Sequence, residues 1–135
     1  MDNLTKMTKE QKAKMQRLFE KANVGANDVF THAHFMIINR SGIEKLQYSN
    51  GIQVQYEAIT NTEDFACVKA TGKKGIQTIE TFGSACTANT KGQGNYFAEM
   101  AEKRALSRVV LKILRLYEVG IFGEDENVQN NSTNH

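Results

Sequence analysis

The residues with the clearest chemistry are cations on one side of a predicted helix late in the chain. Residues 96–117 have the longest helical pattern in the sequence and a broad apolar face. On a helical wheel Arg104, Arg108, Lys112 and Arg115 fall within about 80°, with no carboxylate among them. Such a row suits the phosphate backbone of a nucleic acid. A charged stripe opposite an apolar face is also ordinary solvated surface, so both interpretations stay open.

The charge distribution adds to the nucleic-acid hypothesis. The formal net charge is +2, but residues 1–117 hold all seventeen Lys and Arg and eleven of the fifteen acidic residues, a formal +6. The remaining four acidic residues make the C-terminal segment −4. A basic body is compatible with a polyanionic partner, and it also lies within the range that solubility alone favours.

Other kinds of chemistry have weak support in the sequence. There is no P-loop, no HExxH motif and no nucleophile with a base at motif spacing, so we expect no enzyme. Cys67 and Cys86 lack a partner at metal-ligand spacing and are interpreted as free, buried thiols. His32 and His34 would share one side of an extended segment, but no third ligand is evident. We therefore expect neither a metal nor a cofactor.

The elements that must position the cations follow from periodicity. A capping box at Thr8 and Gln11 opens a predicted amphipathic helix over residues 8–23. A strand over 34–38 follows, and a second capping box at Ser41 and Glu44 opens a short helix. Beyond it, strands are predicted at 52–58, 65–70 and 76–86, with residues 72–75 as a hairpin loop.

These elements predict an α+β fold: an antiparallel three- to four-stranded β-meander packed against one long C-terminal helix, with an additional N-terminal helix. A chain of 135 residues suits a single core. We expect an N-terminal amphipathic helix over 1–25, one nucleic-acid-binding domain over 26–126 and a disordered tail over 127–135. No apolar run suits a membrane span and no export signal is visible, so we expect a cytoplasmic protein with no membrane role.

Two short motifs resemble a known family. Residues 101–108 (AEKRALSR), after three predicted strands and a glycine-containing loop, resemble the A-x-K-R-A-L signature of single-strand annealing proteins of the Rad-fifty-two and phage Erf superfamily. Residues 120–126 (GIFGEDE) are similar to the G-x-x-G-E-D ending of its phage and prophage members.

Over residues 42–126 the resemblance implies a β-β-β-α core. It also implies a groove for single-stranded DNA, lined by basic residues of the helix and of a β-hairpin, and assembly into rings or filaments. Lys103 and Arg104 match the family's DNA-contacting pair. Ser107 stands where better-known members place a third arginine, and Arg108 is the nearest replacement.

The leading hypothesis is a homo-oligomeric protein that binds single-stranded DNA and promotes annealing in phage-type recombination, in the cytoplasm of a bacterial host, without catalysis or cofactor. Its candidate DNA-binding residues are Lys73, Lys74, Lys91, Lys103, Arg104, Arg108, Lys112 and Arg115, and its candidate base-stacking residues are Tyr48, Tyr56 and Tyr96.

Two alternatives remain. Residues 43–114 also have the helix, three strands and helix of a double-stranded RNA-binding module. A protein-interaction domain without a nucleic-acid role would instead use the long helix to dock a partner.

Overall fold

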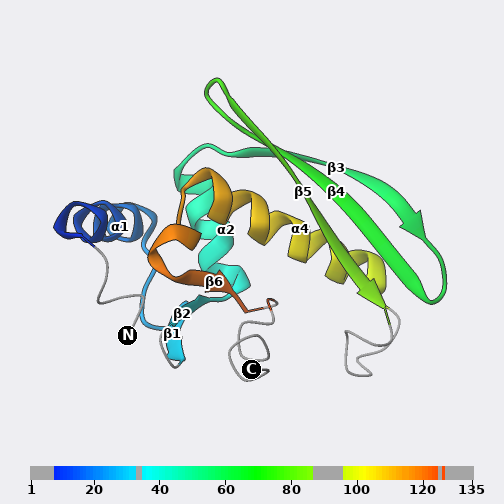
Figure 1. The fold of residues 1–135 in the computed structure, drawn as a ribbon, viewed down its shortest axis with the longest axis horizontal. Helices are drawn as coiled ribbons and strands as arrows, with labels where there is room; N and C mark the ends of the chain where they lie inside the picture. Colours follow the sequence, from blue (N-terminus) through cyan, green and yellow to red (C-terminus); the bar gives the residue numbers. More distant parts are fainter. Residues whose placement is uncertain (1–7, 33–34, 87–95, 125, 127–135) are drawn as a thin grey trace. The chain divides into compact units, whose positions relative to one another are not determined.

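The computed structural model describes residues 8–32, 35–86, 96–124 and 126, with its elements labelled in Figure 1. Within these residues it combines helices with two three-stranded sheets, so the expected α+β class is confirmed. The chain forms two compact units. Unit 1 comprises Met1–Gly51 and Leu114–His135, and unit 2 comprises Ile52–Ile113. The predicted domain over 26–126 contributes to both units, and the predicted tail over 127–135 lies outside the described residues.

The first helix of unit 1, α1 (Lys9–Ala22), begins with the capping box that the sequence predicts. The Gln11 N–H donates to Thr8 Oγ1 at 3.0 Å, and the Thr8 N–H donates to Gln11 Oε1 at 3.0 Å. The helix ends at Asn23, which takes a left-handed conformation with φ of 59°. No helix in the described part of the chain is long and apolar enough to cross a membrane.

The second helix, α2 (Arg40–Ser49), begins earlier than predicted. Its N-cap is Asn39, whose Oδ1 accepts a hydrogen bond from the Gly42 N–H at 3.0 Å. The amide of Asn39 thus holds the first turn. The capping box predicted at Ser41 and Glu44 is therefore wrong.

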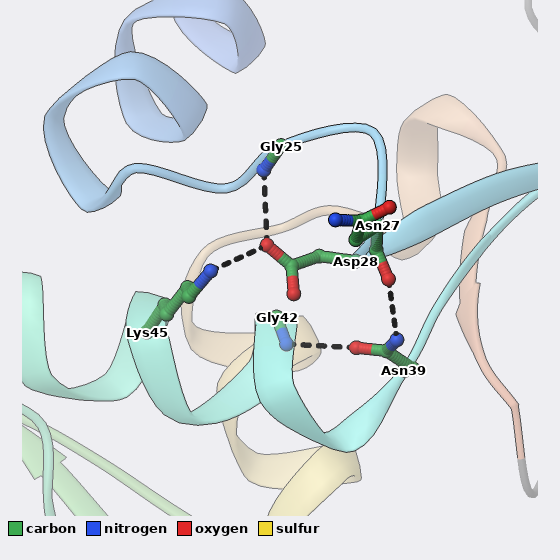
Figure 2. Close-up of polar contacts among 6 residues, drawn as sticks. All are labelled: Gly25, Asn27, Asp28, Asn39, Gly42 and Lys45. Atoms are coloured by element: carbon green, nitrogen blue, oxygen red, sulfur yellow. Dashed lines mark hydrogen bonds and ion pairs between the residues drawn. The ribbon is translucent and has the colours of Figure 1, made fainter.

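A buried carboxylate fixes the chain before α2 (Figure 2). Asp28 accepts hydrogen bonds from the Gly25 N–H at 3.0 Å and from Lys45 Nζ at 2.7 Å. Asn39 Nδ2 donates to the Asn27 carbonyl at 2.9 Å. The Gly25 N–H and then the Lys45 ammonium hold the pKa of Asp28 below its ordinary value. The carboxylate of Asp28 therefore has a structural role, because it joins the Gly25 backbone to the Lys45 side chain.

The sheet of unit 1 joins segments that are far apart in the sequence. β1 (Val29–His32) pairs antiparallel with β2 (Phe35–Ile38), and β2 pairs parallel with β6 (Ile121–Gly123). A 3-10 helix, η1 (Tyr117–Val119), leads into β6. Of these strands the sequence predicts only the segment of β2.

Unit 2 contains the antiparallel sheet β3-β4-β5, which consists of β3 (Gln53–Asn61), β4 (Phe65–Lys74) and β5 (Gln77–Cys86). The hairpin between β4 and β5 is tighter than predicted, because pairing continues to Lys74 and Gln77. Only Gly75, with φ of 61°, and Ile76 form the turn. A positive φ at the first central residue alone is the pattern of a type II′ turn.

The helix α4 (Phe97–Ile113) packs on one face of this sheet (Figure 1). Small residues let it approach closely: a Cβ added at Gly83 would overlap the backbone of α4, and one added at Gly72 would overlap Val109. The helix ends before the predicted residue 117, since Arg115 takes a positive φ of 60°.

Candidate nucleic-acid interface

Two of the predicted DNA-binding arginines have structural partners on the neighbouring strand. Arg104 Nη1 donates to the Ser84 carbonyl at 2.7 Å, and Arg108 Nη1 donates to the Phe82 carbonyl. Both carbonyls belong to β5, an edge strand of its sheet. The two contacts are evenly spaced because the four residues from Arg104 to Arg108 advance about 6 Å along the helix, roughly the length of two strand residues. These guanidinium groups therefore tie the sheet edge to the helix.

The predicted four-cation stripe is interrupted at its last member. Arg115 lies beyond the end of α4, in unit 1, where its Nε donates to Glu118 Oε2 at 2.8 Å. This contact raises the pKa of Arg115. The helical position predicted for Arg115 is thus wrong, because the chain leaves the helix two residues earlier.

The two remaining cations of α4 differ in setting. Lys112 is exposed and, among the described residues, has no ion pair. It continues the row of Arg104 and Arg108 at the spacing of one helical turn. Lys103 is half-buried and lies about 100° around the helix from Arg104. Lys112 therefore keeps its charge at the surface.

Lys73 and Lys74 are exposed at the end of β4, next to the β4–β5 turn. The preceding residue, Gly72, packs against Val109 and Ile113 of α4. The last turn of α4 thus lies at the hairpin end of the sheet. The structure places Lys73, Lys74 and Lys112 at this one end of unit 2, which we call the basic end. Lys91 lies outside the described residues.

The other end of unit 2 is acidic. A hollow of about 620 Å³ lies between the β3–β4 connection and the first turn of α4. Its lining includes the carboxylates of Glu63, Asp64 and Glu99, together with Tyr96. The structure thus places Tyr96 at the opposite end of the sheet from the hairpin lysines, beside charges that would repel a phosphate.

The other two candidate tyrosines belong to different units. Tyr48 belongs to α2 in unit 1, where it is 91% exposed and lines an open hollow of about 750 Å³ with Lys21 and Lys45. Tyr56 pairs with Ala70, and its side chain lies on the face of the sheet that α4 covers. Within unit 2, the hollow that Tyr96 lines does not include Tyr56.

The uncovered face of the sheet in unit 2 is a surface that the sequence reasoning missed. None of its side chains is buried, and it includes two exposed phenylalanines, Phe65 at 38% and Phe82 at 49%. The sequence of β4 contains a period of two that indicates such a face, since Phe65, Cys67 and Lys69 alternate with the small or apolar Ala66 and Val68, which are buried. We call this the open face; on β4 and β5 it consists of Phe65, Cys67, Lys69, Thr71, Lys73, Thr78, Glu80, Phe82, Ser84 and Cys86.

Comparison with known proteins adds no assignment: no family model, no curated protein and no solved structure matches the chain. Within the described residues, no three side chains of metal-ligating type come together. A proposal about function therefore rests on the residues of this chain alone.

Proposed function

We propose that this protein binds single-stranded DNA and promotes the annealing of complementary strands, as an oligomer and without catalysis. The observation that carries the proposal is the basic end of unit 2. There Lys73, Lys74 and Lys112 project three exposed ammonium groups that have no ion pair among the described residues. Exposed, unpaired cations at one end of a sheet are suited to phosphates.

The mechanism follows from electrostatics. Two complementary strands repel each other through their phosphates, and lysines that replace condensed counterions reduce this repulsion. Ammonium groups contact phosphates as point charges and leave the base edges free to pair. Several protomers along one strand would hold it extended, so that a second strand can pair with it.

The resemblance of residues 101–108 supports the same function in part. The order of three strands and one helix in unit 2 is the arrangement that the resemblance implies. Of its two matched cations, Arg104 donates to the Ser84 carbonyl, so the proposal rests on the hairpin lysines and Lys112 instead. This assignment moves the expected DNA contacts toward the β4–β5 turn.

The test is a titration with fluorescent single-stranded DNA, duplex DNA, single-stranded RNA and duplex RNA over a range of salt. The proposal expects single-stranded DNA to bind most tightly, binding to weaken steeply with salt, and complementary strands to anneal faster with protein than without. Tighter binding of duplex RNA would favour a double-stranded RNA-binding module instead. Binding no tighter than that of heparin at equal charge would refute the proposal.

A charge-matched control locates the site. The triple variant Lys73→Glu, Lys74→Glu, Lys112→Glu should abolish binding at moderate salt. The variant Lys9→Glu, Lys12→Glu, Lys14→Glu changes the net charge equally, on exposed positions of α1. It should keep most of the affinity. Equal losses in both variants would show that net charge, and not the basic end, determines binding.

A further inference from the structure

The open face of unit 2 has a defined arrangement of aromatic and small side chains. Cross-strand neighbours in an antiparallel sheet share a face, so the register gives successive rows across β4 and β5. Phe65 lies opposite Cys86, the small pair Cys67 and Ser84 forms the next row, and Lys69 lies opposite Phe82 in the third. The two rings therefore stand on either side of a row of small side chains.

The exposure of the rings suits unstacked bases. The rows of Phe65 and Phe82 are four strand residues apart, about 14 Å at the usual rise of an antiparallel strand. Both rings are partly exposed, whereas the alternate residues Ala66, Val68 and Ala85 are buried under α4. Flat, exposed rings on an open sheet are the surface on which single-stranded nucleic acids stack their bases.

The charges of this face fix the orientation of a bound strand. Lys69 Nζ lies 3.5 Å from a carboxylate oxygen of Glu57 and 3.7 Å from one of Glu80. The middle of the face thus has its cation compensated by two carboxylates and does not attract phosphate. Lys73, two rows further along, is exposed and has no ion pair among the described residues. The row of Phe82 lies four strand residues, about 14 Å, from that of Lys73. A strand along this face would therefore place the phosphates of one end at the hairpin and the bases of other nucleotides over the rings.

We propose that Phe65 and Phe82 are base-stacking residues, and that the open face binds the unpaired bases of a single strand whose phosphates contact Lys73 and Lys74. This inference rests on the proposed function and deepens it, because it assigns the residues that contact the bases of the single strand. A duplex keeps its bases stacked inside and offers these rings nothing to stack on.

The chain has no tryptophan, so a single introduced indole reports on this face alone. Phe82→Trp should show fluorescence quenching on addition of a thymidine oligonucleotide, and no quenching with an abasic oligonucleotide of equal length. Phe30→Trp, at an exposed phenylalanine on β1 of unit 1, is the matched control and should respond far less. Equal responses at both positions would overturn the assignment.

Affinity gives the second measurement. Phe65→Ala and Phe82→Ala should each weaken binding of the thymidine oligonucleotide about tenfold, with binding of the abasic oligonucleotide unchanged. Phe30→Ala, the matched control on β1, should change neither.

The outcomes separate the two proposals. If the wild-type protein binds neither oligonucleotide, both the proposed function and the stacking inference are wrong. If it binds both equally well, or if the alanine variants keep full affinity, only the stacking inference fails. If the fluorescence of the Phe82→Trp variant is quenched as its own concentration rises, without any oligonucleotide, the open face binds a second copy of the chain. That result also overturns the inference.

Discussion

Arg104 of α4 donates a hydrogen bond from Nη1 to the main-chain carbonyl of Ser84 on β5, at 2.7 Å. Arg108 makes the equivalent contact one turn later, to the carbonyl of Phe82. Edge strands expose unpaired backbone groups, and proteins commonly cover them. Here the cover is a pair of guanidinium groups from the packed helix. Cations that resemble a phosphate-binding row in the sequence thus also stabilise the fold.

We predict that Arg104→Ala lowers the free energy of unfolding by about 1–3 kcal/mol, because a charged hydrogen bond in a partly buried setting is lost. Arg108→Ala should cost less, since its contact is exposed. Urea unfolding followed by circular dichroism measures both. Lys112→Ala, one turn further along, is the control and should stay within about 0.5 kcal/mol of wild type. If Arg104→Ala left the free energy of unfolding unchanged, this result would contradict a structural role for the arginine.

A second prediction concerns the close approach of α4 to its sheet. Gly83→Ala should destabilise unit 2 by about 1–3 kcal/mol or more, because the new methyl group would overlap the backbone of Ala101 and Ala105. Gly72→Ala should also destabilise the unit but cost less than Gly83→Ala, since its methyl group would overlap a side-chain atom of the buried Val109 and no backbone atom. Gly75→Ala meets no neighbouring atom, so its cost reflects only the positive φ. Thermal unfolding should rank Gly83→Ala as the most damaging of these three substitutions.

Local patterns in the sequence predicted local structure well. The capping box of Thr8 and Gln11 depends on residues three apart, and both of its hydrogen bonds form. The alternation of residues 52–58 predicts a strand there, and β3 forms over Gln53–Asn61. Such signals are available because the interacting groups are close in the chain.

Long-range partners were not predictable in the same way. The helical wheel shows where Arg104 points, but only the fold brings the Ser84 carbonyl within reach. The parallel pairing of Ile37 with Phe122 joins residues 85 positions apart, and neither segment specifies the other. The stacking candidates Phe65 and Phe82 required knowledge of which face of the sheet α4 covers. A period of two indicates that a strand has two faces, and tertiary packing decides which one is buried.

A third prediction uses the buried carboxylate of unit 1. The pKa of Asp28 is lowered in the folded state, so its ionised form stabilises the fold at neutral pH, and this stabilisation is lost as the pH falls below about 4. Asp28→Asn should therefore cost about 1–3 kcal/mol at pH 7, and the gap from wild type should close in acid. Urea unfolding at a series of pH values measures the gap. Glu118→Gln, which removes an exposed ion pair, is the control and should give a small, nearly flat difference.

The last prediction concerns the number of phosphates that the three lysines contact. If Lys73, Lys74 and Lys112 each contact one phosphate, the variant with all three changed to Gln should reduce the slope of log affinity against log salt by about 2, because each contact with a single strand contributes about 0.7. Each single Gln variant should remove about one third of that change. Arg108→Gln, whose guanidinium donates to the Phe82 carbonyl, should leave the slope nearly unchanged while lowering stability. A slope that falls with Arg108→Gln and not with the lysine variants would move the phosphate contacts from the hairpin back to the helix.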